Sequence, residues 1–241
     1  MNGHEGPPGG LLRDVVGLVW PRGCAGCDRP DEVLCARCRA LMSSTIERPL
    51  AGSRGVSSVS CGVYRGPVRH AILSWKDHDD VECDGPFALL LADLALRCGA
   101  ARADVPLTLV PAPSSTASMR RRGRAHMHDL TLRTVRELRR RGVDARCMPL
   151  LRNGAVGGKS VETSGASQRG ERIRGRIHTV PARMPRAAGP VFLTDDIVTT
   201  GSTLRQCAAA LESVGVGVAG ALTLASVPER GSADEMGCPE L

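Results

Sequence analysis

Aromatic residues are scarce in this chain of 241 residues, which has only two Trp, one Tyr and two Phe. This scarcity argues against a single-strand nucleic-acid platform that stacks successive bases on aromatic rings. Lysine is equally rare, because Lys76 and Lys159 are the only two, so the formal net charge of +7 is carried almost entirely by arginine. The positive charge still allows a surface that binds phosphate groups.

Long apolar runs are also absent, since none approaches the roughly 20 residues that a membrane helix requires. The first ten residues are polar and contain Glu5 and two prolines, so they lack the charged and then apolar build of a secretory signal. We therefore expect a cytoplasmic protein without membrane insertion. With 42% hydrophobic residues, the chain is long enough to bury the core of one α/β domain plus a small attachment.

Ten cysteines in a chain of this kind indicate metal ligands or free thiols before disulfides. Four of them have the spacing Cys-x2-Cys-x7-Cys-x2-Cys, and they are Cys24, Cys27, Cys35 and Cys38. Two such pairs can place four thiolates around one tetrahedral ion, and zinc is the expected metal. Its role is expected to be structural, because four cysteines leave no open position for catalysis. An iron–sulfur cluster is the alternative occupant.

The most informative segment is 191–203, in which an apolar strand leads into two adjacent carboxylates and a hydroxyl-rich glycine turn, before a helix pattern at 204–214. The N-terminus of such a helix favours a phosphate group. Backbone and hydroxyl donors for this phosphate are expected from Thr199, Thr200, Gly201, Ser202 and Thr203. Asp195 and Asp196 would bind ribose hydroxyls, directly or through Mg²⁺. We expect a site for a ribose 5-phosphate here, the alternative being a strand followed by a capped helix.

A second candidate loop follows the apolar segment 107–110. Pro111 and Ala112 begin this loop, and four arginines follow at 120–124. Arginine offers paired donors that match a diphosphate, so Arg122 is a candidate ligand-binding residue. The alternative is a solvated basic turn without a ligand.

The order of apolar patterns predicts an α/β fold. Strands are expected at 56–63, 107–110, 145–150, 191–193 and 216–224, and helices at 36–46, 67–75, 87–98, 125–140 and 204–214. This alternation is typical of a mostly parallel sheet with helices on both faces, in which ligands bind beyond the carboxyl ends of the strands.

Residues 50–55 have the composition of a linker, which places a domain boundary near residue 52. We therefore expect an N-terminal segment at 1–50 that holds the four cysteines at 24–38, an α/β domain at 55–227, and a loose tail at 228–241.

Three further features have weaker interpretations. Residues 153–160 are similar to a nucleotide P-loop but have Asn153 where such a loop needs glycine, so we interpret 153–168 as a glycine-rich flap. Lys76 ends a predicted helix and would meet either the helix dipole or a phosphate. His126 and His128 lie near the second candidate loop and could donate to a diphosphate when protonated, but exposed helix histidines usually have no specific role. Their spacing places them on different faces of the helix, which argues against a shared metal.

Segment 191–203 resembles the 13-residue signature of type I phosphoribosyltransferases, which bind 5-phosphoribosyl-1-diphosphate (PRPP). Together with the cysteine pairs, the segment 64–76 from a tyrosine to a lysine, and the Pro-x-Pro loop with its Arg-Gly, it makes residues 15–225 resemble the ComF family. This is a phosphoribosyltransferase-like group linked to DNA uptake in competent bacteria. The chain departs from it at 124–126, where Arg-Ala-His replaces the usual Phe-Asn-Gln.

The resemblance implies a type I phosphoribosyltransferase-like sheet that binds PRPP with Mg²⁺, with Asp195 and Asp196 as catalytic residues and Lys76 and Arg122 among the ligand-binding ones. The implied reaction is transfer of the phosphoribosyl group to an unidentified acceptor. One alternative is a PRPP- or single-stranded-DNA-binding factor of the competence machinery that performs no turnover. Another is an unrelated phosphate-binding protein whose zinc ribbon contacts a partner.

Overall fold

The computed structural model describes residues 22–50, 52, 53, 55–114, 123–154, 177–180 and 189–228. They contain a six-stranded sheet whose spatial order is β1 (Ile46–Pro49), β2 (Ser57–Val63), β8 (Gly220–Ser226), β7 (Val191–Val198), β3 (Leu107–Pro111) and β4 (Ala145–Cys147). A separate antiparallel pair consists of β5 (Leu151–Asn153) and β6 (Ile177–Thr179). The helices are α2 (Ala36–Ala40), α3 (Gly66–Asp77), the short 3-10 helix η1 (Val81–Cys83), α4 (Asp84–Arg97), α6 (His126–Arg140) and α8 (Ser202–Glu212).

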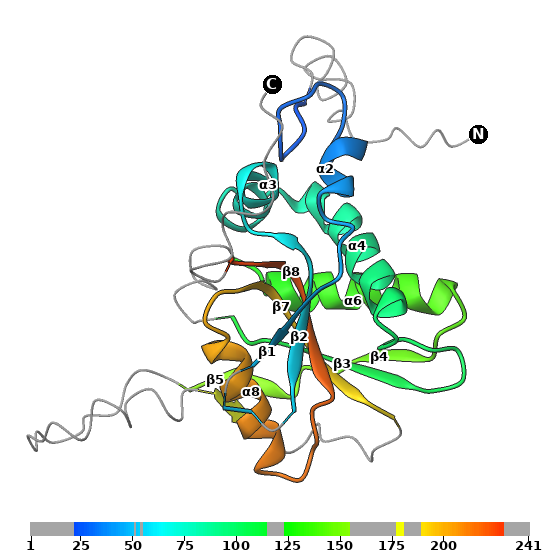
Figure 1. Ribbon diagram of the computed structural model, residues 1–241, viewed down its shortest axis with the longest axis vertical. Helices are drawn as coiled ribbons and strands as arrows, with labels where there is room; N and C mark the ends of the chain where they lie inside the picture. The colour runs from blue at the N-terminus through cyan, green and yellow to red at the C-terminus, as the bar shows by residue number, and fades with distance from the viewer. Residues whose placement is uncertain are drawn as a thin grey trace, which may run out of the picture.

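Neighbouring strands of the larger sheet run parallel, except that the edge strand β1 is antiparallel to β2. Helices α4 and α6 cover one face and α8 covers the other (Figure 1). Successive side chains of a strand point to opposite faces, so Leu109 of β3 packs with α4 and α6 while Val110 packs with α8. The predicted fold class, a mostly parallel sheet with helices on both faces, is confirmed.

The four-cysteine segment lies at one end of the molecule, beside α3 and α4 (Figure 1). Its buried residues Leu34 and Met42 belong to the same apolar cluster as Val68 of α3 and Phe87 of α4. The segment therefore packs on the α/β core.

The helix predicted at 36–46 is wrong in its second half. Helix α2 ends at Ala40, and Ile46 begins strand β1 instead. The Ser43 hydroxyl donates to the carbonyl of Arg39 (2.9 Å), a local bond by which serine competes with continued helix.

The predicted linker is a hairpin turn between β1 and β2. Leu50 is buried, and its N–H donates to the carbonyl of Val56 (3.0 Å). The division of the chain near residue 52 stays a prediction. Residues 46–49 pair with β2, so an α/β domain that begins after them would lack its edge strand.

The β5–β6 pair was not predicted, and the other elements follow the predicted order with three corrections. The strand predicted at 145–150 ends at Cys147, and the one predicted at 216–224 begins only at Gly220. Strand β7 continues to Val198 rather than ending at residue 193, because its pairing with β8 extends that far. Within the described parts of the chain, no helix has the length and apolar character to cross a membrane. Most of the predicted flap and nearly all of the predicted tail lie outside the described residues.

Candidate functional site

A pocket of about 470 Å³ lies at the carboxyl ends of β3 and β7. Residues of α3, α6 and α8 line it together with the loops after β3 and β7 and with the β5–β6 pair. The carboxyl ends of parallel strands are the usual ligand position in sheets of this type. Both loops that the sequence singles out therefore meet at one cavity.

The two predicted carboxylates, Asp195 and Asp196, line this pocket from within β7. The N–H of Asp196 donates to Asp195 Oδ1 (2.9 Å), and the N–H of Ile197 donates to Asp196 Oδ1 (2.7 Å). These bonds hold one oxygen of each carboxyl group, Oδ1, against the strand backbone. Asp196 is only 7% exposed.

Two nitrogen-bearing side chains approach the second carboxylate. Lys76 Nζ, from the last turn of α3, forms an ion pair with Asp196 Oδ2, and His126 Nε2, from the first residue of α6, lies 3.5 Å from the same oxygen. The sequence left open whether Lys76 contacts only its helix dipole or a ligand. It lines the pocket, where it neutralises Asp196.

The environments of the two carboxyl groups separate their pKa values. Burial opposes ionisation of Asp196, but the hydrogen bond from His126 and the charge of Lys76 outweigh it and hold the pKa of Asp196 below its usual range. Burial, followed by the negative charge of Asp196, raises the pKa of Asp195 to about 7. Near neutral pH the pair thus contains one ionised carboxylate and one group that readily gains or loses a proton.

The hydroxyl-rich turn places two of its side chains in the pocket, those of Thr199 and Thr203. Thr200 has a local role, because its Oγ1 accepts the N–H of Ser202 (3.4 Å) at the start of α8. Gly201 is the residue before the helix. Gly201 and Ser202 are not among the described residues that line the pocket. The first N–H groups of α8 have no partners within the helix, so this end of the pocket suits an anion.

Two arginines hold the backbone of this turn. Arg48 of β1 donates to the carbonyl of Thr199 (2.8 Å), and Arg205 of α8 donates to the carbonyl of Thr200 (2.7 Å). Because these two carbonyl groups accept hydrogen bonds from the arginines, the peptide groups of the turn are oriented without a ligand. The sequence did not indicate the contact of Arg48, since 151 residues separate it from Thr199.

The proline-containing loop forms the facing wall. Pro111 ends β3 beside Thr194 of β7, and the N–H of Ala112 donates to the carbonyl of Thr194 (2.8 Å). Ala112 and the next two residues line the pocket, whereas Pro111 lies behind them in the sheet. Arg122, the predicted diphosphate ligand, lies outside the described residues.

Three polar residues of the pocket, His126, Asn153 and Gln206, were not among the predicted site residues. His126 was expected to be exposed, but it is 4% exposed and faces Asp196 because it precedes the buried Met127 on the inner side of α6. Asn153 donates to the carbonyls of Pro113 (3.0 Å) and Ser114 (2.8 Å), and so clamps the proline loop. Gln206 lies one turn after Thr203 on α8, a spacing that could have identified it.

The four predicted metal ligands converge at a separate site. Their sulfur atoms all lie within 4.8 Å of one another, and Cys35 immediately precedes α2. Gly26 has no room for a side chain, because a Cβ there would lie 2.8 Å from Cys38 Sγ and 2.9 Å from the carbonyl of Pro67. Burial opposes ionisation of Cys24, but backbone N–H groups led by that of Cys35 lower its pKa to about 7. Four cysteines around a common centre fit a tetrahedral metal ion.

Comparison with known proteins finds distant likeness among solved structures. No protein-family model and no curated protein matches this chain. Among solved structures, the chain is similar to adenine phosphoribosyltransferase from Thermoanaerobacter pseudethanolicus, with 15% sequence identity and a TM-score of 0.36, over 80% of this chain and 88% of that one. A likeness this distant assigns neither a ligand nor a reaction to the chain. Any argument about its ligand and reaction must therefore come from its own side chains.

Proposed function

We propose that the pocket binds PRPP and that the chain is a phosphoribosyltransferase acting on an unidentified acceptor. The observation that supports this most directly is the joint placement of the Asp195–Asp196 pair and of Thr199 and Thr203 around one cavity. Carboxylates suit the hydroxyl groups of a ribose, and hydroxyl donors at a helix N-terminus suit its phosphate. A sugar phosphate carries its hydroxyl groups at one end and its phosphate group at the other, so one ligand can contact both parts of the pocket.

The ligand is then oriented by the walls of the pocket. The 5-phosphate would lie against Thr199 and Thr203, the ribose hydroxyls against the acidic pair, and the diphosphate toward the loop that begins with Ala112. Lys76 is the cationic side chain nearest the acidic pair and could contact either the ribose or the diphosphate. Mg²⁺ bound with the diphosphate would neutralise part of its charge, and Asp195 and Asp196 are the protein oxygens available to it.

The proposed transfer breaks the bond between C1 of the ribose and the diphosphate oxygen and forms a bond between C1 and the acceptor. Diphosphate leaves with the bonding electrons, and the acceptor gives up a proton. Asp195 is suited to take this proton, because a pKa of about 7 lets it act as a general base near neutral pH. Asp196, which stays ionised, would stabilise positive charge on the sugar ring.

For the cysteine cluster we propose a structural Zn²⁺. Four sulfur ligands close the coordination shell, so a metal there would stabilise the N-terminal segment without taking part in chemistry. We further propose, from the resemblance to the ComF family, that the chain acts in DNA uptake by competent bacteria, in the cytoplasm. Its net charge of +7 favours single-stranded DNA as an additional partner, bound through phosphate contacts that weaken as salt increases.

Calorimetric titration of PRPP with Mg²⁺ into the zinc-loaded protein tests the ligand assignment. We expect micromolar binding, its loss in Asp195→Asn combined with Asp196→Asn, and unchanged zinc content in that variant because the two sites share no side chain. Asp104→Asn is the matched control, since it removes an exposed carboxylate that pairs with Arg102. Equal affinity in the double variant and the control would contradict the assignment.

A further inference from the structure

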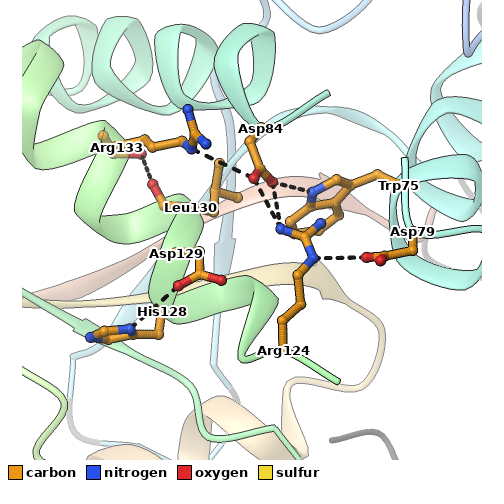
Figure 2. A network of polar contacts seen from close by, with 9 residues as sticks. Trp75, Asp79, Asp84, Arg124, His128, Asp129, Leu130 and Arg133 are labelled. Carbon is orange, nitrogen blue, oxygen red and sulfur yellow. Dashed lines mark hydrogen bonds and ion pairs between the residues drawn. The ribbon is translucent and has the colours of Figure 1, made fainter. Parts of the chain in front are cut away.

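A cluster of charged and aromatic side chains joins α3, α4 and α6 (Figure 2). Arg124, Asp84 and the indole of Trp75 point toward one another, although they come from three separate segments of the chain. Asp79, between α3 and η1, and Arg133 of α6 complete the polar part. The proposed chemistry does not use any of these side chains.

Trp75 is fixed on several sides. It is 1% exposed, its indole N–H donates to Asp84 Oδ1 (2.6 Å), and its ring meets that of Phe87 edge to face at a centroid distance of 5.5 Å. A buried indole with its N–H bonded and its ring packed has one orientation available.

Arg124 secures this arrangement from the side of α6. Its Nη1 donates to both oxygens of Asp84 (2.9 and 3.2 Å), and its Nε donates to Asp79 (2.8 Å). The carboxylate of Asp84 is almost fully buried, so its oxygens obtain their hydrogen bonds from these donors and from the indole rather than from water. Arg124 also stands two residues before His126, and thereby ties the start of α6 to α4.

His126 lies between this cluster and the pocket. Its ring meets Trp75 at a centroid distance of 5.0 Å and an interplanar angle of 78°, and its Nε2 faces Asp196 Oδ2 at 3.5 Å. The imidazole is therefore held by a rigid neighbour on one side and reaches the predicted ribose-binding carboxylate on the other. Lys76, which pairs with the same oxygen, has a longer and more flexible side chain that is 27% exposed.

We propose that His126 is a positioning residue that holds Asp196 in the orientation needed to accept ribose hydroxyl groups, and that Trp75 and Asp84 hold His126 in place. The inference rests on the proposed function, because it assigns a ribose to the acidic pair. Each carboxylate oxygen can accept two hydrogen bonds, so after the contacts of Oδ2 with His126 and Lys76 and of Oδ1 with the Ile197 N–H, Asp196 keeps one acceptor site for a ligand, on Oδ1. Without the imidazole donor, Oδ1 of Asp196 is still held by the Ile197 N–H, but of the contacts described above Oδ2 keeps only the one with the flexible Lys76 side chain. Oδ2 can then shift, and the hydroxyl contact of the carboxylate weakens while the phosphate contacts at α8 remain.

The test compares the affinities for ribose 5-phosphate and 2-deoxyribose 5-phosphate by calorimetry with Mg²⁺ present. We expect the unmodified chain to prefer the ribose ligand. His126→Leu should lower this preference roughly tenfold, the size expected for loss of one charge-assisted hydrogen bond. His126→Gln retains an N–H donor near the position of Nε2 and should stay within about threefold of the unmodified chain. His128→Leu, on the half-exposed side of α6 beside Asp129, is the matched control and should change nothing.

Trp75→Phe probes the outer link, because it keeps an aromatic ring and removes the donor to Asp84. We expect a roughly threefold loss of preference that disappears when His126→Leu is already present, since residues acting through one another are not additive. Thermal melting confirms that each variant is folded, and His126→Met supplies a second side chain without a donor should the leucine variant not fold.

The outcomes separate this inference from the proposed function. If the unmodified chain binds neither PRPP nor ribose 5-phosphate, the proposed function and the inference fail together. If it binds both and His126→Leu or His126→Met keeps the full preference for ribose, the positioning role alone is overturned. Equal loss in the glutamine and leucine variants would also overturn it, because the effect would then come from packing.

Discussion

At the scale of single residues, the properties of the site depend on how neighbouring side chains shift one another's pKa values. Asp195 and Asp196 are adjacent in sequence and share one pocket, yet their pKa values move in opposite directions because only Asp196 contacts Lys76 and His126 directly. A sequence motif of two carboxylates does not distinguish the two roles. The distinction comes from residues on α3 and α6 that the fold brings to one of the two side chains.

The raised pKa of Asp195 predicts a pH dependence of stability. The folded chain keeps the Asp195 proton up to about pH 7, whereas an unfolded aspartate loses it near pH 4, so this group makes the fold less stable as pH rises between these values. Asp196, with its lowered pKa, contributes a constant amount across that window. Asp195→Asn should therefore gain melting temperature relative to the unmodified chain between pH 5 and pH 8. A difference that does not change with pH would contradict the assignment.

Gly201 shows how one backbone position shapes the phosphate end of the pocket. Its φ is +70°, and a Cβ would lie 2.7 Å from Cδ2 of Leu50, which is buried and has little space to move. Gly201→Ala should reduce the free energy of unfolding by about 2–3 kcal/mol and weaken PRPP binding. Gly215→Ala is the control, because it has a similar φ of +81° with nothing within 4 Å of its Cβ, and it should cost about 1 kcal/mol without affecting binding. Denaturant unfolding measures both, and equal losses would refute the steric argument.

At the scale of elements, apolar periodicity predicted most of the sheet and the helices that follow Pro67. It missed β1, a strand of four residues whose side chains are half-buried and exposed in turn, with a proline at its end. Such a strand has little apolar signal of its own, and proline is tolerated there because it is an edge strand. Its place in the sheet depends on pairing with β2 and on contacts with the turn after β7.

This edge strand is expected to support ligand binding from outside the pocket. Arg48 donates to the carbonyls of Thr199 (2.8 Å) and Val227 (3.2 Å), so it ties β1 to the turn that would bind the 5-phosphate. Arg48→Ala should lower PRPP affinity about fivefold through loss of these bonds while the chain stays folded. Arg102→Ala, which removes an exposed arginine paired with Asp104, should leave the affinity unchanged. Titration calorimetry compares the two, and equal affinities would show that the hairpin has no part in the site.

At the scale of the whole molecule, the sequence indicated which segments line the pocket but not how they meet. The Asp-Asp segment, the proline loop and the Tyr-to-Lys helix were each identified, and all three line one pocket. The contact of His126 with Asp196 joins residues 70 positions apart in the sequence, on α6 and β7, and only the packed fold brings them together. The position of the cysteine segment was likewise not evident from the sequence, because its distinct composition suggested a unit separate from the sheet.

The buried core is continuous across that suggested boundary. Cys24, Cys35 and Cys38 belong to one apolar cluster with Val68 of α3 and Phe87 of α4, and Arg22 donates to Asp80 (2.6 Å) just beyond α3. A segment that shares its core with the sheet should unfold with it rather than before it. We therefore expect one calorimetric unfolding transition for the zinc-loaded chain.

Cys24→Ser tests this coupling, because it opens the metal shell and removes most of the free energy that a bound ion would supply. The variant should lose its zinc, and the midpoint of the single transition should fall by several degrees, since the destabilised segment is part of the common core. Cys98→Ser is the control, because that half-buried thiol at the end of α4 donates only to the carbonyl of Ala95, as a hydroxyl also can, and it should retain the zinc. Two transitions, of which Cys24→Ser moves only the first, would mean that the cysteine segment is an independent unit and that its metal does not stabilise the pocket. A single shifted transition would mean that the metal helps to stabilise the position of α3. It would then also help to hold Lys76 and Trp75 of that helix near the acidic pair.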